Sequence, residues 1–130
     1  MEQKLTIITL GVDDLEKSIE FYENKLGWKR SEASNENIVF YPVNEILLAL
    51  FPREELAGDA GVDGAGDGFK GFTLAQNLES ESAVDEMIDT LRQKGVAIVK
   101  EPQKVFWGGY SSYIADPDGN LWEIAYNPFM

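Results

Sequence analysis

Residues 104–113, KVFWGGYSSY, are the part of the sequence best suited to hold a flat ligand. The segment carries Phe106, Trp107 and Tyr110 beside the glycine pair Gly108 and Gly109. Aromatic rings stack on planar groups for roughly 0.5–1.5 kcal/mol beyond the burial of area, and they also attract cations. We therefore predict a ligand platform here. The sequence leaves one alternative open: the rings pack in the core or a dimer interface, and the glycines form a β-bulge.

Glu123 is the charged residue that we expect to face a binding site. Side chains alternate along a strand, so Glu123 lies on the face opposite Trp122 and Ile124 in the strand predicted for residues 121–126. A carboxylate in such a place suits a cationic ligand or acts as a base. The alternative is a carboxylate that is paired with a neighbouring Tyr, Ser or Lys.

The run DPDGN at residues 116–120 has oxygen-bearing side chains at alternate positions, as calcium loops do. Its glycine and the following Glu123 stand at the wrong offsets for such a loop. Pro presets φ, Asp bonds its own backbone and Gly accepts positive φ. The run therefore predicts a tight turn between two strands.

Composition excludes several kinds of chemistry. The 130 residues include no cysteine and no histidine, which rules out disulfides, thiolate nucleophiles, a Ser-His-Asp triad and imidazole metal ligands. The 11 Lys and Arg against 23 Asp and Glu give a net charge of −12. This charge opposes nucleic-acid binding and favours a cationic ligand over an anionic one.

The N-terminal apolar run is short, because Asp13 and Asp14 interrupt it. A membrane span needs roughly 20 apolar residues, and a signal peptide needs a longer apolar core than this. We expect a cytoplasmic protein with no membrane partner.

The same order of elements is predicted twice, which suggests one domain built from two modules, residues 4–52 and 69–127. In the first, a strand at 5–12 precedes a helix from Asp14 to Leu26 and strands at 28–33, 37–42 and 46–51. In the second, a strand at 69–75 precedes a helix that begins at Ser80 and strands at 96–100, 109–114 and 121–126. Residues 57–68, AGDAGVDGAGDG, predict a connector that is either a lid or disordered.

Two motifs carry a resemblance to a known family. LGVDDLEKSIEFY at residues 10–22, with LGW at 26–28, and YIADPDGNLWEI at 113–124 resemble the glyoxalase / bleomycin-resistance / dioxygenase superfamily, also called vicinal oxygen chelate proteins. The resemblance implies an α+β fold in which two βαβββ modules form a cup-shaped mixed sheet. It also implies a homodimer with a ligand or metal cleft inside the cup.

The resemblance also implies four positions for metal ligands. They map to Ile7, Ala49, Gly71 (Phe72 if the register slips by one) and Glu123, of which only Glu123 can bind a metal through its side chain. Hard divalent cations take about six oxygen ligands. We therefore predict no metal site and no cofactor.

These observations favour a metal-independent binding protein of the bleomycin-resistance type that holds a planar or cationic compound. The predicted ligand-binding residues are Trp107, Tyr110, Phe106, Tyr41, Trp28 and Glu123. The alternative is a glyoxalase-like lyase, isomerase or dioxygenase with an atypical or absent metal site and Glu123 as base or ligand. A third possibility is a dimer without a cleft that serves as an interaction domain.

Overall fold

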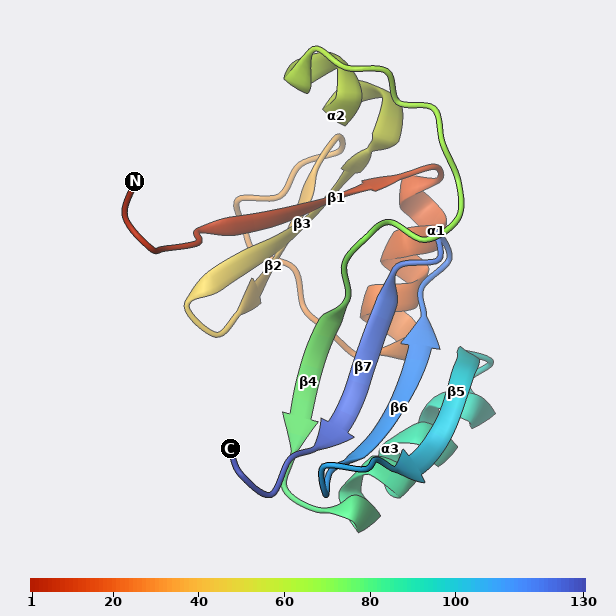
Figure 1. Cartoon of the computed structure of the whole chain (residues 1–130). Helices are drawn as coiled ribbons and strands as arrows, with labels where there is room; N and C mark the ends of the chain where they lie inside the picture. Colours follow the sequence, from red (N-terminus) through yellow and green to blue (C-terminus); the bar gives the residue numbers. More distant parts are fainter. The chain divides into compact units, whose positions relative to one another are not determined.

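The structure is a computed structural model that describes residues 1–130. The chain divides into two compact units, residues 1–66 and 67–130 (Figure 1). None of the helices is both long enough and apolar enough to cross a lipid bilayer. The α+β fold class predicted from the sequence is confirmed, because each unit combines helix with a small mixed sheet.

Unit 1 contains a sheet of three strands in the order β1-β3-β2. β1 (Ile7–Val12) runs parallel to β3 (Ile46–Pro52), and β2 (Val39–Val43) runs antiparallel to β3. The central strand β3 carries the fully buried Leu50 and Ala49, as expected for a strand that is paired on both edges.

The first helix begins where the sequence predicts. The Asp14 side chain caps α1 (Leu15–Ile19) by accepting a 3.2 Å hydrogen bond from the Lys17 backbone N–H. The helix then widens into the π-helix η1 (Glu20–Lys25), and its Phe21 and Tyr22 side chains are buried. π-Helical turns are rare, and nothing in the apolar spacing distinguishes this one from an ordinary helix.

The strand predicted for residues 28–33 is not formed, so unit 1 has three strands where a βαβββ module has four. Arg30 turns back to pair with Glu23 on η1. The Ser34 backbone N–H donates to the Ser31 carbonyl, which closes a turn in place of a strand ladder. The Ala33 N–H also donates to the Ser31 hydroxyl at 3.1 Å, so the prediction was wrong because the turn and the Arg30–Glu23 pair together hold this segment in a form other than a strand.

The connector prediction for residues 57–68 was wrong at its N-terminal end. Residues 57–60 belong to helix α2 (Arg53–Ala60), which ends at Gly61 in the left-handed conformation with φ of 75°. Glu54 and Glu55 lie in its first turn, where the helix dipole favours acidic side chains. Ala57 is buried, so this stretch contributes an apolar residue to the core, which its high Gly and Asp content does not indicate.

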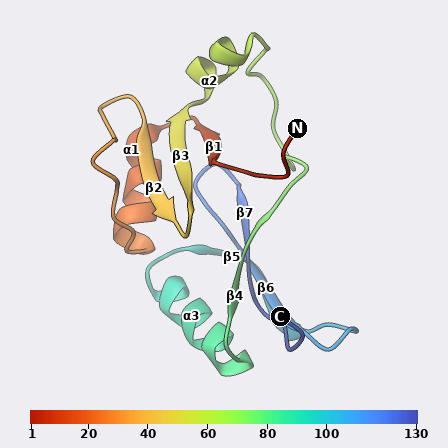
Figure 2. The same ribbon diagram turned by 90° about the vertical axis from the view of Figure 1, so that its left-hand side faces the viewer.

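Unit 2 contains a sheet of four strands in the order β4-β7-β6-β5. These strands are β4 (Leu74–Leu78), β5 (Ala97–Lys104), β6 (Tyr110–Ala115) and β7 (Leu121–Tyr126). Helix α3 (Glu81–Gln93) covers one face of this sheet, as Figures 1 and 2 show from two directions. The element order β4-α3-β5-β6-β7 confirms the predicted βαβββ pattern for this unit.

The helix predicted to begin at Ser80 and the tight turn predicted at residues 116–120 are both confirmed. The Ser80 hydroxyl caps α3 by accepting from the Ala83 N–H at 3.0 Å, and Val84, Ile88 and Leu91 form its buried stripe. In the turn, Asp116 Oδ1 accepts from the backbone N–H of Asp118 and of Asn120, at 3.0 and 2.8 Å.

The first strand of unit 2 starts later than predicted, at Leu74 in place of residue 69. Gly68 and Gly71 have φ of 78° and 86°, a left-handed conformation that extended strands do not contain. The aromatic residues around these glycines suggested a strand, but the glycines themselves prevent it.

Candidate functional site

The two faces of the unit 2 sheet have different chemistry. One face packs on α3 and includes the buried Ile114, Trp122 and Ile124. Because side chains alternate along a strand, Glu123 lies on the other face, as the sequence predicts. The α3 helix does not cover this second face, which we call the Glu123 face.

Ser111 holds the carboxylate on this face. Its hydroxyl donates a 2.6 Å hydrogen bond to Glu123 Oε2 across the antiparallel β6–β7 pair. Ser111 is 5% exposed, and Glu123 is half-buried. Of the partners left open for Glu123 by the sequence, the structure therefore selects a serine. One carboxylate oxygen is oriented by the protein, and no protein group donates to the other.

Tyr113 stands directly beside Glu123, because the two residues are register partners on β6 and β7. Side chains opposite each other in an antiparallel pair have Cβ atoms roughly 5 Å apart. Burial, and then the negative charge of Glu123, raises the pKa of Tyr113 above its ordinary value. A tyrosine phenol is protonated at neutral pH, so the Tyr113 hydroxyl can donate a hydrogen bond.

Trp107 adds an aromatic ring to the same face. A Cβ built on Gly109 would collide with the Trp107 indole, so the ring lies where a side chain at position 109 would point. Position 109 continues the alternation of Ser111 and Tyr113, because the Val105 N–H donates to the Gly109 carbonyl and extends the β5–β6 pairing. The indole remains 40% exposed.

Tyr110 lies on the opposite face from Glu123. Its hydroxyl donates a 2.7 Å hydrogen bond to Asp85 on α3, and its register partner is Tyr126. This bond is the largest cause that raises the pKa of Tyr110, ahead of burial. Alternation along β6 therefore separates Tyr110 from Glu123, although the sequence prediction placed both at one site.

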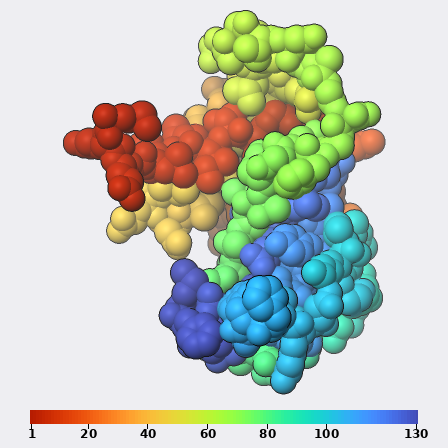
Figure 3. Space-filling view, in the orientation of Figure 1, coloured from red at the N-terminus to blue at the C-terminus, as the bar shows by residue number.

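Phe106 points away from the protein, and its side chain is fully exposed. A Cβ built on the neighbouring Gly108 would lie 3.7 Å from the Phe129 ring of the C-terminal turn. Figure 3 shows the chain around residues 105–110 beside the dark blue C-terminal residues at the surface of unit 2. Phe106 therefore stands next to Trp107 in the sequence, but no contact holds its ring on the Glu123 face.

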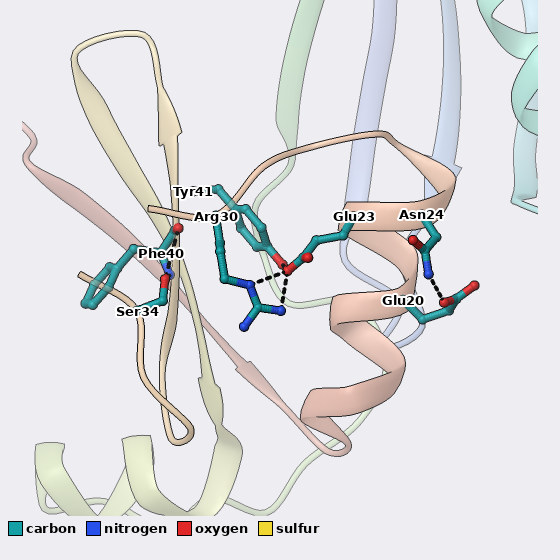
Figure 4. Close-up of polar contacts among 7 residues, drawn as sticks. All are labelled: Glu20, Glu23, Asn24, Arg30, Ser34, Phe40 and Tyr41. Atoms are coloured by element: carbon teal, nitrogen blue, oxygen red, sulfur yellow. Dashed lines mark hydrogen bonds and ion pairs between the residues drawn. The ribbon is translucent and has the colours of Figure 1, made fainter. Parts of the chain in front are cut away.

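Tyr41 and Trp28 lie in unit 1 and contact each other, with ring centroids 5.8 Å apart. Tyr41 is fully buried, and its hydroxyl donates a 3.0 Å hydrogen bond to Glu23 Oε2. The same oxygen accepts from Arg30 Nε at 2.9 Å, so two donors converge on one carboxylate (Figure 4). The contacts of Tyr41 are those of a core residue, and a role for Tyr41 and Trp28 in ligand binding stays a prediction.

Comparison with known proteins identifies the family. The chain matches the profile of the Glyoxalase/Bleomycin resistance protein/Dioxygenase superfamily over residues 4–124. The chain belongs to this superfamily. Among solved structures, a glyoxalase-related enzyme from Fulvimarina pelagi superposes with a TM-score of 0.86 at 36% identity, covering 98% of this chain and 90% of that one.

Two curated bacterial proteins resemble the chain over most of its length. YraH from Bacillus subtilis is 33% identical over 126 residues, which cover 93% of this chain and 96% of YraH. The metallothiol transferase FosB from Lysinibacillus sphaericus is 32% identical over 122 residues, or 94% of this chain and 81% of FosB. A lactoylglutathione lyase from Arabidopsis thaliana is 29% identical, but the match spans only 42% of that protein.

The residues of this superfamily member do not fit a divalent metal. Ile7 and Ala49 lie on β1 and β3 and offer only apolar side chains, and Gly71 precedes β4 in a left-handed conformation. Phe72, the alternative position, is also apolar. Glu123 is held by Ser111, and no group of three or more Asp or Glu side chains is placed to hold a metal ion.

Sequence analysis missed two members of the Glu123 face, Ser111 and Tyr113. Both belong to the segment KVFWGGYSSY, but the prediction rested on its other aromatic residues and its glycines. Alternation along residues 109–113 carried the signal, because it sets Ser111 and Tyr113 on one face and Tyr110 on the other. Their pairing with Glu123 depends on the β6–β7 register, which no local pattern encodes.

Proposed function

We propose that this chain is a metal-independent binding protein that holds a planar, cationic small molecule on the Glu123 face. The single observation that supports this function is that Glu123, Tyr113 and Trp107 share the face of the sheet that α3 does not cover. The carboxylate supplies the counter-charge, and the indole supplies a flat surface for stacking and cation–π attraction.

The ligand's positive charge follows from the electrostatics of the face and of the whole chain. Glu123 keeps one carboxylate oxygen without a protein donor, while Ser111 fixes the other. The net charge of −12 concentrates cations near the protein and repels anions. A hydrogen bond from a charged donor to a carboxylate contributes about 1.5–3 kcal/mol, more than a neutral pair.

A matched pair of probes tests the proposal. Benzamidine is a planar aromatic cation, and benzamide is a neutral molecule of nearly the same shape. Calorimetric titration of the protein, after treatment with a chelator, should show saturable binding of benzamidine and binding of benzamide that is at least about tenfold weaker. Equal affinity for the two probes, or no binding of benzamidine, would refute a cation site at Glu123.

An enzyme remains the second candidate, because the chain resembles proteins named as a transferase and a lyase. In that case Glu123 would act as a base, held in place by Ser111. Conversion of a bound compound that disappears in Glu123→Gln, while the variant stays folded, would establish the enzyme. The homodimer that the resemblance implies also stays a prediction, which sedimentation equilibrium would test.

A further inference from the structure

A row of residues crosses all four strands of the unit 2 sheet at the level of Glu123. Ala75 on β4 pairs with Glu123 on β7, which pairs with Tyr113 on β6, which pairs with Lys100 on β5. Ala75 and Lys100 are exposed, whereas Tyr113 and Glu123 are half-buried. The Ala75 side chain is a single methyl group and does not reach over Glu123.

Lys100 points to the same face as Glu123. Its neighbour Glu101 binds Arg92 of α3 through two hydrogen bonds of 2.6 and 2.8 Å, so Glu101 lies on the helix-covered face. The pairing of Lys100 with Tyr113, itself the register partner of Glu123, sets Lys100 on the Glu123 face, because residues opposite each other in a ladder share a face of the sheet. The register shifts on either side of Lys100 leave its pairing with Tyr113 intact.

The face therefore carries a cation, a phenol and an anion in order across three adjacent strands. No ion pair joins Lys100 to Glu123, and no hydrogen bond of the Tyr113 hydroxyl is found within the protein. Neighbouring strands lie about 4.8 Å apart, so the backbones of Lys100 and Glu123 are separated by roughly 10 Å. The flexible lysine side chain can span part of that distance over Tyr113.

We infer that the ligand of this face is a zwitterion, an alkylamine that also carries a carboxylate and an aromatic ring. The ammonium group binds Glu123, the carboxylate binds Lys100 and accepts from the Tyr113 hydroxyl, and the ring stacks on Trp107. This inference rests on the proposed function and adds the negative group of the ligand. Tyr113 suits the middle position because a phenol is protonated at neutral pH and donates to a carboxylate.

Three probes that differ in their charged groups separate the proposed cation site from the inferred site for a carboxylate. Phenylalanine carries both charges, phenethylamine carries only the ammonium group, and 3-phenylpropanoate carries only the carboxylate. We expect phenylalanine to bind roughly tenfold more tightly than phenethylamine in calorimetric titrations, since each charge-assisted hydrogen bond adds that much or more. We expect 3-phenylpropanoate to bind most weakly.

Two lysine variants test whether Lys100 causes the preference for phenylalanine over phenethylamine. Lys100→Met should bring the affinities for phenylalanine and phenethylamine to within about threefold of each other. Lys104→Met removes the same charge from the same strand, but Lys104 pairs with Tyr110 on the opposite face, so this control should keep the preference. Tyr113→Phe should reduce the preference partially, and thermal unfolding checks that all three variants are folded.

The possible results distinguish the inference from the proposed function. Equal binding of phenylalanine and phenethylamine to the wild type overturns the zwitterion and leaves the cation site standing. A preference that survives Lys100→Met, or that Lys104→Met also removes, overturns the assignment to Lys100. Failure of both amines to bind overturns the zwitterion and the cation site together.

Discussion

The Ser111 hydroxyl donates a 2.6 Å hydrogen bond to Glu123 Oε2 across the β6–β7 pair. This contact turns a half-buried carboxylate into an oriented acceptor, with one oxygen bound by the protein and the other available to a ligand. The free energy that orients Glu123 is therefore provided by folding and not by ligand binding.

Ser111→Ala removes this orientation. We expect the free energy of unfolding to fall by about 1 kcal/mol, because the half-buried Glu123 carboxylate loses its donor and solvent replaces that donor only in part. Affinity for benzamidine should fall by roughly three- to tenfold. Ser112→Ala is the matched control, since the Ser112 hydroxyl donates to the Ile124 carbonyl at 2.7 Å on the other face. This control should lose stability without losing affinity, and equal affinities in the two variants would contradict the role of Ser111.

Gly109→Ala tests the position of the Trp107 ring. The new methyl group would occupy the space of the indole, which must then leave the sheet. We expect benzamidine affinity to fall about as much as in Trp107→Ala, because both changes remove the stacking surface. Phe106→Ala provides the comparison, since that side chain is fully exposed and should matter little. A larger loss in Phe106→Ala than in Gly109→Ala would show that the ligand stacks on Phe106.

Sequence reasoning succeeded where the determining interactions are local. Ser80 and Asp14 predict helix starts because a cap needs only the next three residues, and the 116–120 turn follows from Pro, Asp and Gly in sequence. The 28–33 strand failed because Arg30 pairs with Glu23, a contact whose geometry depends on the folded helix. The Glu123 face could be predicted only in part, since alternation assigns faces but not cross-strand partners.

The Glu23 carboxylate links Tyr41 and Arg30 in unit 1, and stability measurements should rank its variants. Glu23→Ala leaves a buried Tyr41 hydroxyl without its acceptor and should cost about 2–3 kcal/mol. Tyr41→Phe removes both the donor and the need for an acceptor, and should cost about 1 kcal/mol. Arg30→Ala should cost less than about 1 kcal/mol, because the Arg30 side chain is 42% exposed. Urea unfolding gives the three values, and a cost for Tyr41→Phe above that for Glu23→Ala would contradict this account.

Stability should also fall in alkali because of Tyr41. Burial first, and then the hydrogen bond to Glu23, raises the pKa of Tyr41 well above its ordinary value of 10.0. The unfolded chain therefore releases the phenol proton near pH 10 while the folded chain retains it, so the free energy of unfolding decreases as pH rises above that value. Between pH 9 and about pH 11, this decrease should be smaller in Tyr41→Phe than in the wild type. Parallel curves for the two proteins would show that Tyr41 does not titrate differently on folding.

The most direct test of the central claim is calorimetric titration of benzamidine into chelator-treated wild type and Glu123→Gln. Glutamine keeps an oxygen that can accept from Ser111 but carries no charge, so both proteins should unfold at similar temperatures. The account predicts that benzamidine affinity falls by roughly 10- to 100-fold in Glu123→Gln, while the weak binding of benzamide is unchanged. Undiminished binding of benzamidine to Glu123→Gln would contradict a cation site at Glu123.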